Sequence, residues 1–250
     1  MRVVFISLLI SVVILLPELA QYFDFRFDGG ALLRIPYTAF SYMAVFFHEI
    51  GHTVAWSLYG YLAMPAFDFA HGGGVTIVDN TFSLPLSLFS FAVLVGGGAR
   101  LWISGERMLA LPLFYVVAFA VIALMAGDSR IFCYYMGHGA EVLVACFCLL
   151  RGFTNSIEEG HKELERYLNL VFGFVTLGRN ALLYYGLAYS DVARVAYAMQ
   201  KNGEIQGDFS QLASLMAVPM PIVALWAFSV MVALFAATVF LSVKINRDLS

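Results

Sequence analysis

The sequence has few charged residues. Only 12% of its 250 residues are Asp, Glu, Lys or Arg, whereas soluble domains are about a quarter charged. Hydrophobic residues make up 61% of the chain. A soluble single domain of this length cannot hide so much apolar surface, because too large a share of its residues lies at the surface. We therefore expect lipid to cover part of the chain.

Basic tracts and paired cysteines are also lacking. The net charge is −3 and no run of Lys and Arg occurs, so we expect no nucleic-acid partner. Cys133, Cys146 and Cys148 fall in one apolar segment without CxxC spacing, and we interpret them as packing residues rather than a disulfide or thiolate metal site. The sequence shows no internal repeat and no long soluble segment. We interpret residues 1–250 as one integral membrane domain.

Long apolar segments dominate what is present. A membrane-spanning helix requires roughly 20 apolar residues. Seven candidates occur, at about 3–20, 37–62, 82–99, 108–126, 131–151, 167–189 and 217–243. The sequence thus predicts an all-α polytopic membrane protein with six or seven transmembrane helices, multi-pass in a bacterial inner (cell) membrane. The more polar stretch 190–212 is expected to form an interfacial helix and loop.

One stretch does not follow the helical pattern. Residues 64–80, "MPAFDFAHGGGVTIVDN", combine alternating apolar and polar positions, three consecutive glycines and β-branched residues. This composition predicts a short β-hairpin or a re-entrant loop. Non-helical backbone at membrane depth is tolerated only where protein buries it or where it lines a wet cavity.

Three ionisable residues interrupt the second apolar segment, in "FFHEIGHTVAW" at 46–56. His48 and His52 are four residues apart, so a helix projects both from nearly the same face, and two such imidazoles can bind one zinc ion. In this HExxH pattern Glu49 is placed to act as general base toward a water molecule. Ionisable groups at the centre of a membrane helix are costly. Their clustering therefore indicates a compensating metal ion.

A second polar pair lies in "YYMGHGAEVLVA", within the predicted helix 131–151. His138 and Glu141 are three residues apart and share a helical face. We interpret His138 as the third metal ligand and Glu141 as the carboxylate that orients it, with the two roles interchangeable. Alternatively, the pair joins two helices as an imidazole–carboxylate contact. Asp128 is interpreted as an N-cap of the fifth span rather than as a ligand.

These residues resemble a known family. The stretch "FHEIGHTVAWSLYG", followed by "HGGGVTI", is similar to the site-2 protease family of intramembrane zinc metalloproteases over about residues 44–78. The resemblance implies that His48 and His52 bind one zinc ion per chain and that Glu49 is the catalytic base. It also implies a short membrane-embedded β-structure after the HExxH helix. The implied reaction is hydrolysis of a peptide bond within, or at the edge of, a transmembrane helix of a membrane-protein or membrane-peptide substrate.

The sequence departs from this family at the third ligand. The family takes that ligand from an aspartate in a later helix, within an LDG-like motif, and no such motif stands here. Two other functions therefore stay open. Glu49 to His52 and His138 to Glu141 have the spacing found in di-metal oxidoreductases, although those sites need two further glutamates and only Glu18 lies in another span. A non-enzymatic membrane scaffold is the other alternative.

Overall fold

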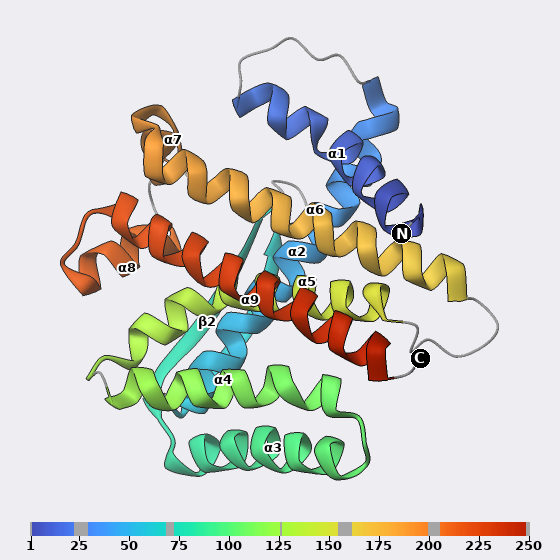
Figure 1. Cartoon of the computed structure of the whole chain (residues 1–250). Helices are drawn as coiled ribbons and strands as arrows, with labels where there is room; N and C mark the ends of the chain where they lie inside the picture. The colour runs from blue at the N-terminus through green and yellow to red at the C-terminus, as the bar shows by residue number, and fades with distance from the viewer. Residues whose placement is uncertain are drawn as a thin grey trace. The chain divides into compact units, whose positions relative to one another are not determined.

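The computed structural model describes residues 2–22, 30–68, 73–125, 127–154, 162–199 and 206–248. Over these ranges the chain is 85% helical and contains nine helices and one two-stranded sheet (Figure 1). The predicted all-α class is confirmed at this level, with the small sheet as its only β-structure in the described residues. The chain divides into two compact units.

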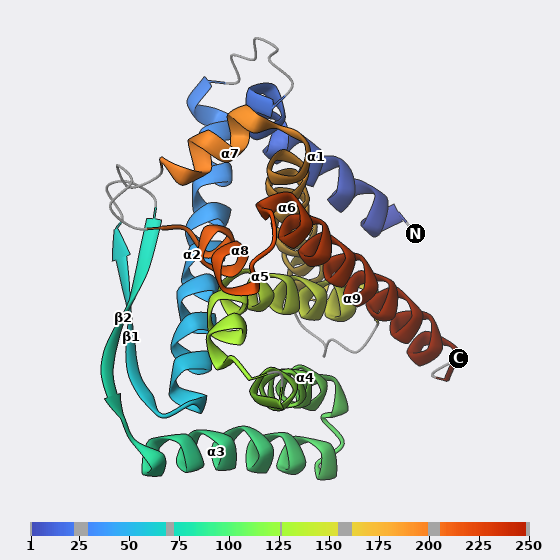
Figure 2. The same ribbon diagram turned by 90° about the vertical axis from the view of Figure 1, so that its left-hand side faces the viewer.

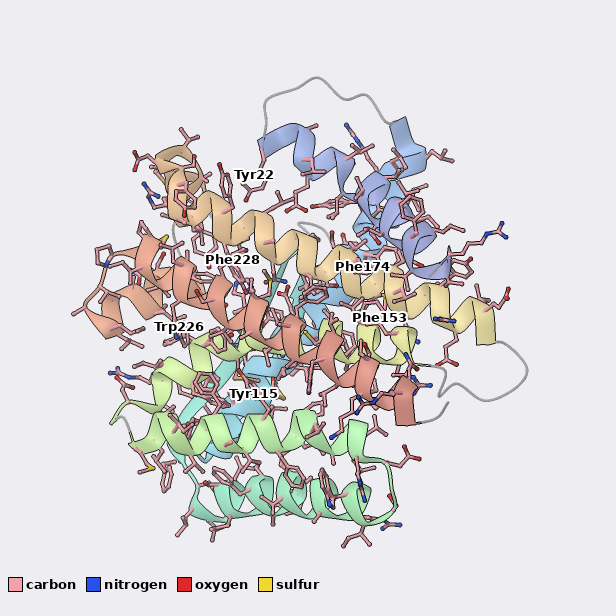
Figure 3. The ribbon with its side chains drawn as sticks, in the orientation of Figure 1. Tyr22, Tyr115, Phe153, Phe174, Trp226 and Phe228 are labelled. Atoms are coloured by element: carbon pink, nitrogen blue, oxygen red, sulfur yellow. The ribbon has the colours of Figure 1, made fainter. Side chains whose placement is uncertain are left out.

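The first unit comprises Met1–Ala44, Glu141–Gly207 and Val218–Ser250. Its complete helices are α1 (Arg2–Tyr22), α6 (Lys162–Tyr189), α7 (Asp191–Ala198) and α9 (Met220–Asp248). Helix α1 packs against α6 through a small buried cluster of Ile14, Leu15, Val171 and Val175. Aromatic rings extend this packing to α5, because Phe153 and Phe174 have ring centroids 6.1 Å apart (Figure 3).

The second unit comprises Val45–Ala140 and Asp208–Ala217. It contains β1 (Tyr61–Asp68), β2 (Gly73–Phe82), α3 (Leu84–Ile103), α4 (Arg107–Met125) and α8 (Asp208–Met216). It also contains the last part of α2 (Gly30–Leu58) and the first part of α5 (Ser129–Phe153). Helices α3 and α4 lie side by side (Figure 1). The first part of α2 and the last part of α5 belong to the first unit. The prediction of one membrane domain over the whole chain stays a prediction.

The strands follow directly on helix α2. Helix α2 ends at Leu58, earlier than the predicted end at 62, because the chain turns at Gly60 with φ +83°. A side chain at Gly60 would also lie 2.6 Å from the carbonyl oxygen of Ser83. Strands β1 and β2 then pair antiparallel, with Met64 opposite Ile77. The predicted β-hairpin after the HExxH helix is thus present.

Within the part of the chain that the structure describes, five helices are long and apolar enough to cross a membrane: Arg2–Ala20, Leu84–Ile103, Ser129–Phe153, Glu163–Tyr189 and Met220–Arg247. Leu109–Met125 is a shorter apolar helix. Helix α2, which carries the HExxH residues, is not among the five. Insertion in a membrane, six or seven spans and a bacterial source stay predictions.

Candidate metal centre

The HExxH residues lie on one continuous stretch of α2 in the second unit. His48 and His52 project from the same face, and their Nε2 atoms are 3.1 Å apart. Their rings meet nearly at right angles, with centroids 4.7 Å apart. His52 and Glu49 are both buried. The helical spacing read from the sequence therefore brings two imidazole nitrogens to one point.

Asp208, the first residue of α8, completes this group. Its Oδ2 atom lies 2.9 Å from His48 Nε2 and 3.1 Å from His52 Nε2. Two imidazole nitrogens and one carboxylate oxygen thus meet within hydrogen-bonding distance of one another. This donor set can hold a metal ion.

The orientation of His52 is set by a backbone carbonyl. Its Nδ1 atom lies 2.7 Å from the carbonyl oxygen of Cys133 on α5, and the contact is buried. A carbonyl oxygen can only accept, so Nδ1 donates to it, and Nε2 is left as the ring nitrogen that can bind a metal ion. Metal-binding histidines are commonly held by such a second hydrogen bond. Cys133 itself contributes through its backbone and not its thiol.

The carboxyl group of Asp208 is held in its charged form. Burial raises its pKa, but the charge of His52 and hydrogen bonds with His48 and His52 outweigh this effect and hold the pKa well below its usual range. Metal ligands must be deprotonated. Asp208 is therefore already in the state that coordination requires.

Glycines allow α5 to approach this face of α2. A Cβ atom at Gly137 would come within 2.6 Å of His48 Nε2 and would also overlap the His52 ring. A Cβ atom at Gly51 would overlap the carbonyl oxygen of Met136 and lie 2.5 Å from Ala140 Cβ. Any side chain at either position would displace helix backbone or an imidazole. The two glycines thus allow α5 to pack closely against α2 while the space around the imidazole nitrogens stays free of side chains.

Glu49 is held from the other side by the hairpin. Thr76 on β2 donates a hydrogen bond to Glu49 Oε2 at 2.7 Å, and its hydroxyl also lies 3.2 Å from the Glu49 carbonyl oxygen. The backbone of Gly74 passes so close that a Cβ atom there would lie 2.5 Å from Glu49 Oε1. Figure 2 shows the two strands running beside α2. The general-base candidate is therefore enclosed by protein.

His138 lies beside the group but is not the closest partner. Its Nε2 atom is 4.0 Å from Asp208 Oδ2, and its ring centroid is 4.6 Å from that of His48 and 5.0 Å from that of Phe209. The structure thus brings the predicted ligand to the predicted place, with Asp208 nearer to the α2 imidazoles. The assignment of His138 as third ligand stays a prediction.

The other acidic candidates have partners of their own. Glu141 belongs to the first unit, where Asn180 Nδ2 donates to its Oε2 at 2.7 Å. Asp128 accepts from the side chain of Arg130 at 2.7 Å and from the Arg130 backbone at 2.9 Å, as expected of a residue preceding a helix. Glu18, also in the first unit, accepts from the Tyr37 hydroxyl at 3.1 Å.

Asp208 was not found from the sequence. It lies in the stretch 190–212, which the sequence predicts to be interfacial, and the described residues of that stretch contain α7 and the first part of α8. The resemblance to site-2 proteases does indicate an aspartate from a late helix. Three aspartates follow the fifth predicted span, Asp191, Asp208 and Asp248. The first two both begin helices, so the local pattern does not distinguish them.

Comparisons with protein-family models, curated proteins and solved structures give no match to this chain. The likeness to site-2 proteases therefore depends on the HExxH sequence and on the glycine-rich stretch that follows it. A functional assignment must come from the geometry of the second unit.

Proposed function

We propose that this chain is a zinc-dependent intramembrane metalloprotease that hydrolyses peptide bonds in or near transmembrane segments of membrane proteins. One observation carries the proposal: the side chains of His48, His52 and Asp208 meet. The buried Glu49 lies on the same helix as the two histidines. Two histidines and a carboxylate are the ligand set of several catalytic zinc sites. The five apolar candidate spans support a substrate that approaches from lipid.

The donor atoms fit one zinc ion. Zinc bonds to imidazole and carboxylate are about 2.0–2.1 Å long, so tetrahedral ligand atoms lie roughly 3.3 Å apart. The three pairwise separations here are 2.9, 3.1 and 3.1 Å. A small outward movement of each side chain accommodates the ion. Three protein ligands would leave the fourth position for water or substrate, as in catalytic rather than structural sites.

When bound, zinc acts as a Lewis acid toward the scissile carbonyl and makes water acidic enough to be deprotonated near neutral pH. Glu49 supplies the base. Its carboxylate accepts the proton of the attacking water as the water oxygen bonds to the carbonyl carbon. It then gives that proton to the amide nitrogen as the C–N bond breaks. Proton and electron pairs balance, and Glu49 returns to its starting state.

The remaining residues orient these groups. The Cys133 carbonyl fixes the His52 ring, and the glycines at 51 and 137 leave room for α5. The substrate must unwind locally, because a peptide bond within a helix is shielded from attack. Glu49 is buried beside Thr76 and Gly74, and this exclusion of bulk water strengthens electrostatic interactions at the site.

The decisive experiment compares wild-type protein with Glu49→Gln in proteoliposomes, with a helical membrane peptide as substrate. Glutamine leaves the proposed ligands intact, so both proteins should bind one zinc per chain. Turnover by Glu49→Gln should fall by about 10²–10⁴-fold, since a general base contributes that much. Glu106→Gln is the matched control, because Glu106 is exposed and lies before α4.

Three results would overturn the proposal. If Glu49→Gln hydrolyses the peptide at the wild-type rate, Glu49 is not the general base. Zinc-loaded wild-type protein that leaves every membrane peptide intact would favour a scaffold. Two irons per chain with visible absorption would favour the di-metal alternative.

A further inference from the structure

Strand β2 presents two different faces. Gly74, Thr76 and Val78 are partly buried, whereas the alternating residues Val75 and Ile77 are exposed. This is the period of two expected of a strand with one covered face. The covered face is the one that meets Glu49, because Thr76 and Gly74 both contact that side chain.

The Thr76 hydroxyl is directed to the carboxylate. A hydroxyl has one proton to donate, and the 2.7 Å contact to Glu49 Oε2 is shorter than the 3.2 Å contact to the Glu49 carbonyl oxygen. Hydrogen bonds to a charged acceptor are about twice as strong as neutral ones. Threonine is β-branched and therefore stiff at χ1, so the strand backbone fixes the direction of this bond.

Gly74 restricts the carboxylate from a second direction. A Cβ atom there would lie 2.5 Å from both Cγ and Oε1 of Glu49, so the backbone of Gly74 packs directly against this side chain and limits its movement. A glutamate side chain loses considerable rotamer freedom when it is held. Fixing it before the substrate binds removes that loss from the reaction step.

We propose that Thr76 is a positioning residue for Glu49, and that its hydroxyl holds the carboxylate in the orientation from which it accepts the proton of water. This inference rests on the proposed function. It assigns to the hairpin a part in catalysis beyond covering α2. Thr76 acts through Glu49 and contacts neither the proposed metal ligands nor the reacting atoms in this assignment.

The test compares Thr76→Val, which keeps the shape and removes the hydroxyl, with Thr76→Ser, which keeps the hydroxyl. Thr76→Val should lower kcat about 10–100-fold, the usual effect of losing a supporting hydrogen bond at a metal site. KM and zinc content should be unchanged, and Thr76→Ser should recover kcat to within about threefold of wild type. Thr81→Val is the control on the same strand, because Thr81 is exposed and its hydroxyl donates to Asp79 Oδ1, away from Glu49.

A merely structural role for Thr76 gives a different pattern. Equal losses in Thr76→Val and Thr76→Ser, a loss of zinc in Thr76→Val, or wild-type kcat in Thr76→Val would each overturn the inference. In the Glu49→Gln background, Thr76→Val should have no further effect on residual turnover, since the two residues act as one unit. An additive loss there would also overturn it.

A second measurement separates this inference from the proposed function. The infrared band of the Glu49 carboxylate is isolated by subtracting the spectrum of Glu49→Gln. Thr76→Val should shift this band and Thr76→Ser should leave it in place; an unshifted band in Thr76→Val overturns the inference whether or not the protein hydrolyses peptides. Absence of hydrolysis by the wild type, with the expected band shift, overturns the proposed function and the catalytic meaning of Thr76 while leaving the hydrogen bond established.

Discussion

The Asp208 carboxylate lies 3.1 Å from Nε2 of His52, across a sequence separation of 156 residues. Neither residue is a metal site alone, and neither lies near the other in the chain. The pair joins α8 to α2 within the second unit. The proposed zinc centre depends on this contact and on the close packing of α5 against α2.

Replacement of Asp208 by Asn should lower zinc affinity by more than about 100-fold, because loss of an outer-shell partner alone costs about 10–100-fold. The neutral amide removes both the negative charge and the carboxylate ligand. Zinc content after dialysis against a buffered zinc series measures the effect. Asp128→Asn is the control, since Asp128 bonds to Arg130. Equal zinc affinity in wild type and Asp208→Asn would show that Asp208 is not a zinc ligand.

Gly137→Ala should abolish zinc binding while leaving most of the helical structure intact. The new methyl group would lie 2.6 Å from His48 Nε2, so one imidazole must turn away. Zinc stoichiometry together with circular dichroism separates these effects. Gly96→Ala is the control, because nothing lies within 4 Å of a Cβ atom there. Full zinc loading of Gly137→Ala would contradict the close approach of α5.

Gly51→Ala should destabilise the fold even without metal. Its methyl group would overlap the Met136 carbonyl oxygen and lie 2.5 Å from Ala140 Cβ, and overpacking of this kind costs about 1–3 kcal/mol. The free energy of unfolding in detergent, measured with chelator present, gives the value. Gly97→Ala has no neighbour closer than 4.0 Å and should be neutral or stabilising. An unchanged stability for Gly51→Ala would show that α2 and α5 are further apart.

Zinc itself should stabilise the protein. A ligand that binds only the folded state at 100 times its Kd adds about 2.7 kcal/mol to the free energy of unfolding. The melting temperature should therefore rise on zinc addition and fall when a chelator removes the ion. The same titration of Asp208→Asn should give a much smaller rise. Identical shifts in both proteins would place the stabilising zinc elsewhere.

The parts of the site that are local in sequence could be predicted from it. His48, Glu49 and His52 follow from helical spacing, and the glycine-rich stretch after them indicated the hairpin that the structure contains. The predicted helix 131–151 lies inside α5, since its apolar residues are continuous over that range. In each case neighbouring residues alone decide the backbone conformation.

Tertiary contacts could not be predicted in the same way. Asp208 stands in a polar stretch whose composition indicates only an interfacial helix and loop, and its approach to His48 depends on packing across the second unit. The pairing of Glu141 with Asn180 was missed for the same reason, because Asn180 carries no charge that the sequence would mark as unusual. Spacing along one helix does not reveal which residue of another helix will face it.

The late position of Asp208 in the chain affects when the centre can form. His48 and His52 leave the ribosome early, but the carboxylate that meets them is translated only after α5, α6 and α7. The candidate metal centre is therefore incomplete during most of the chain's own synthesis. Under the proposed function, membrane segments made before Asp208 would therefore meet no complete active site.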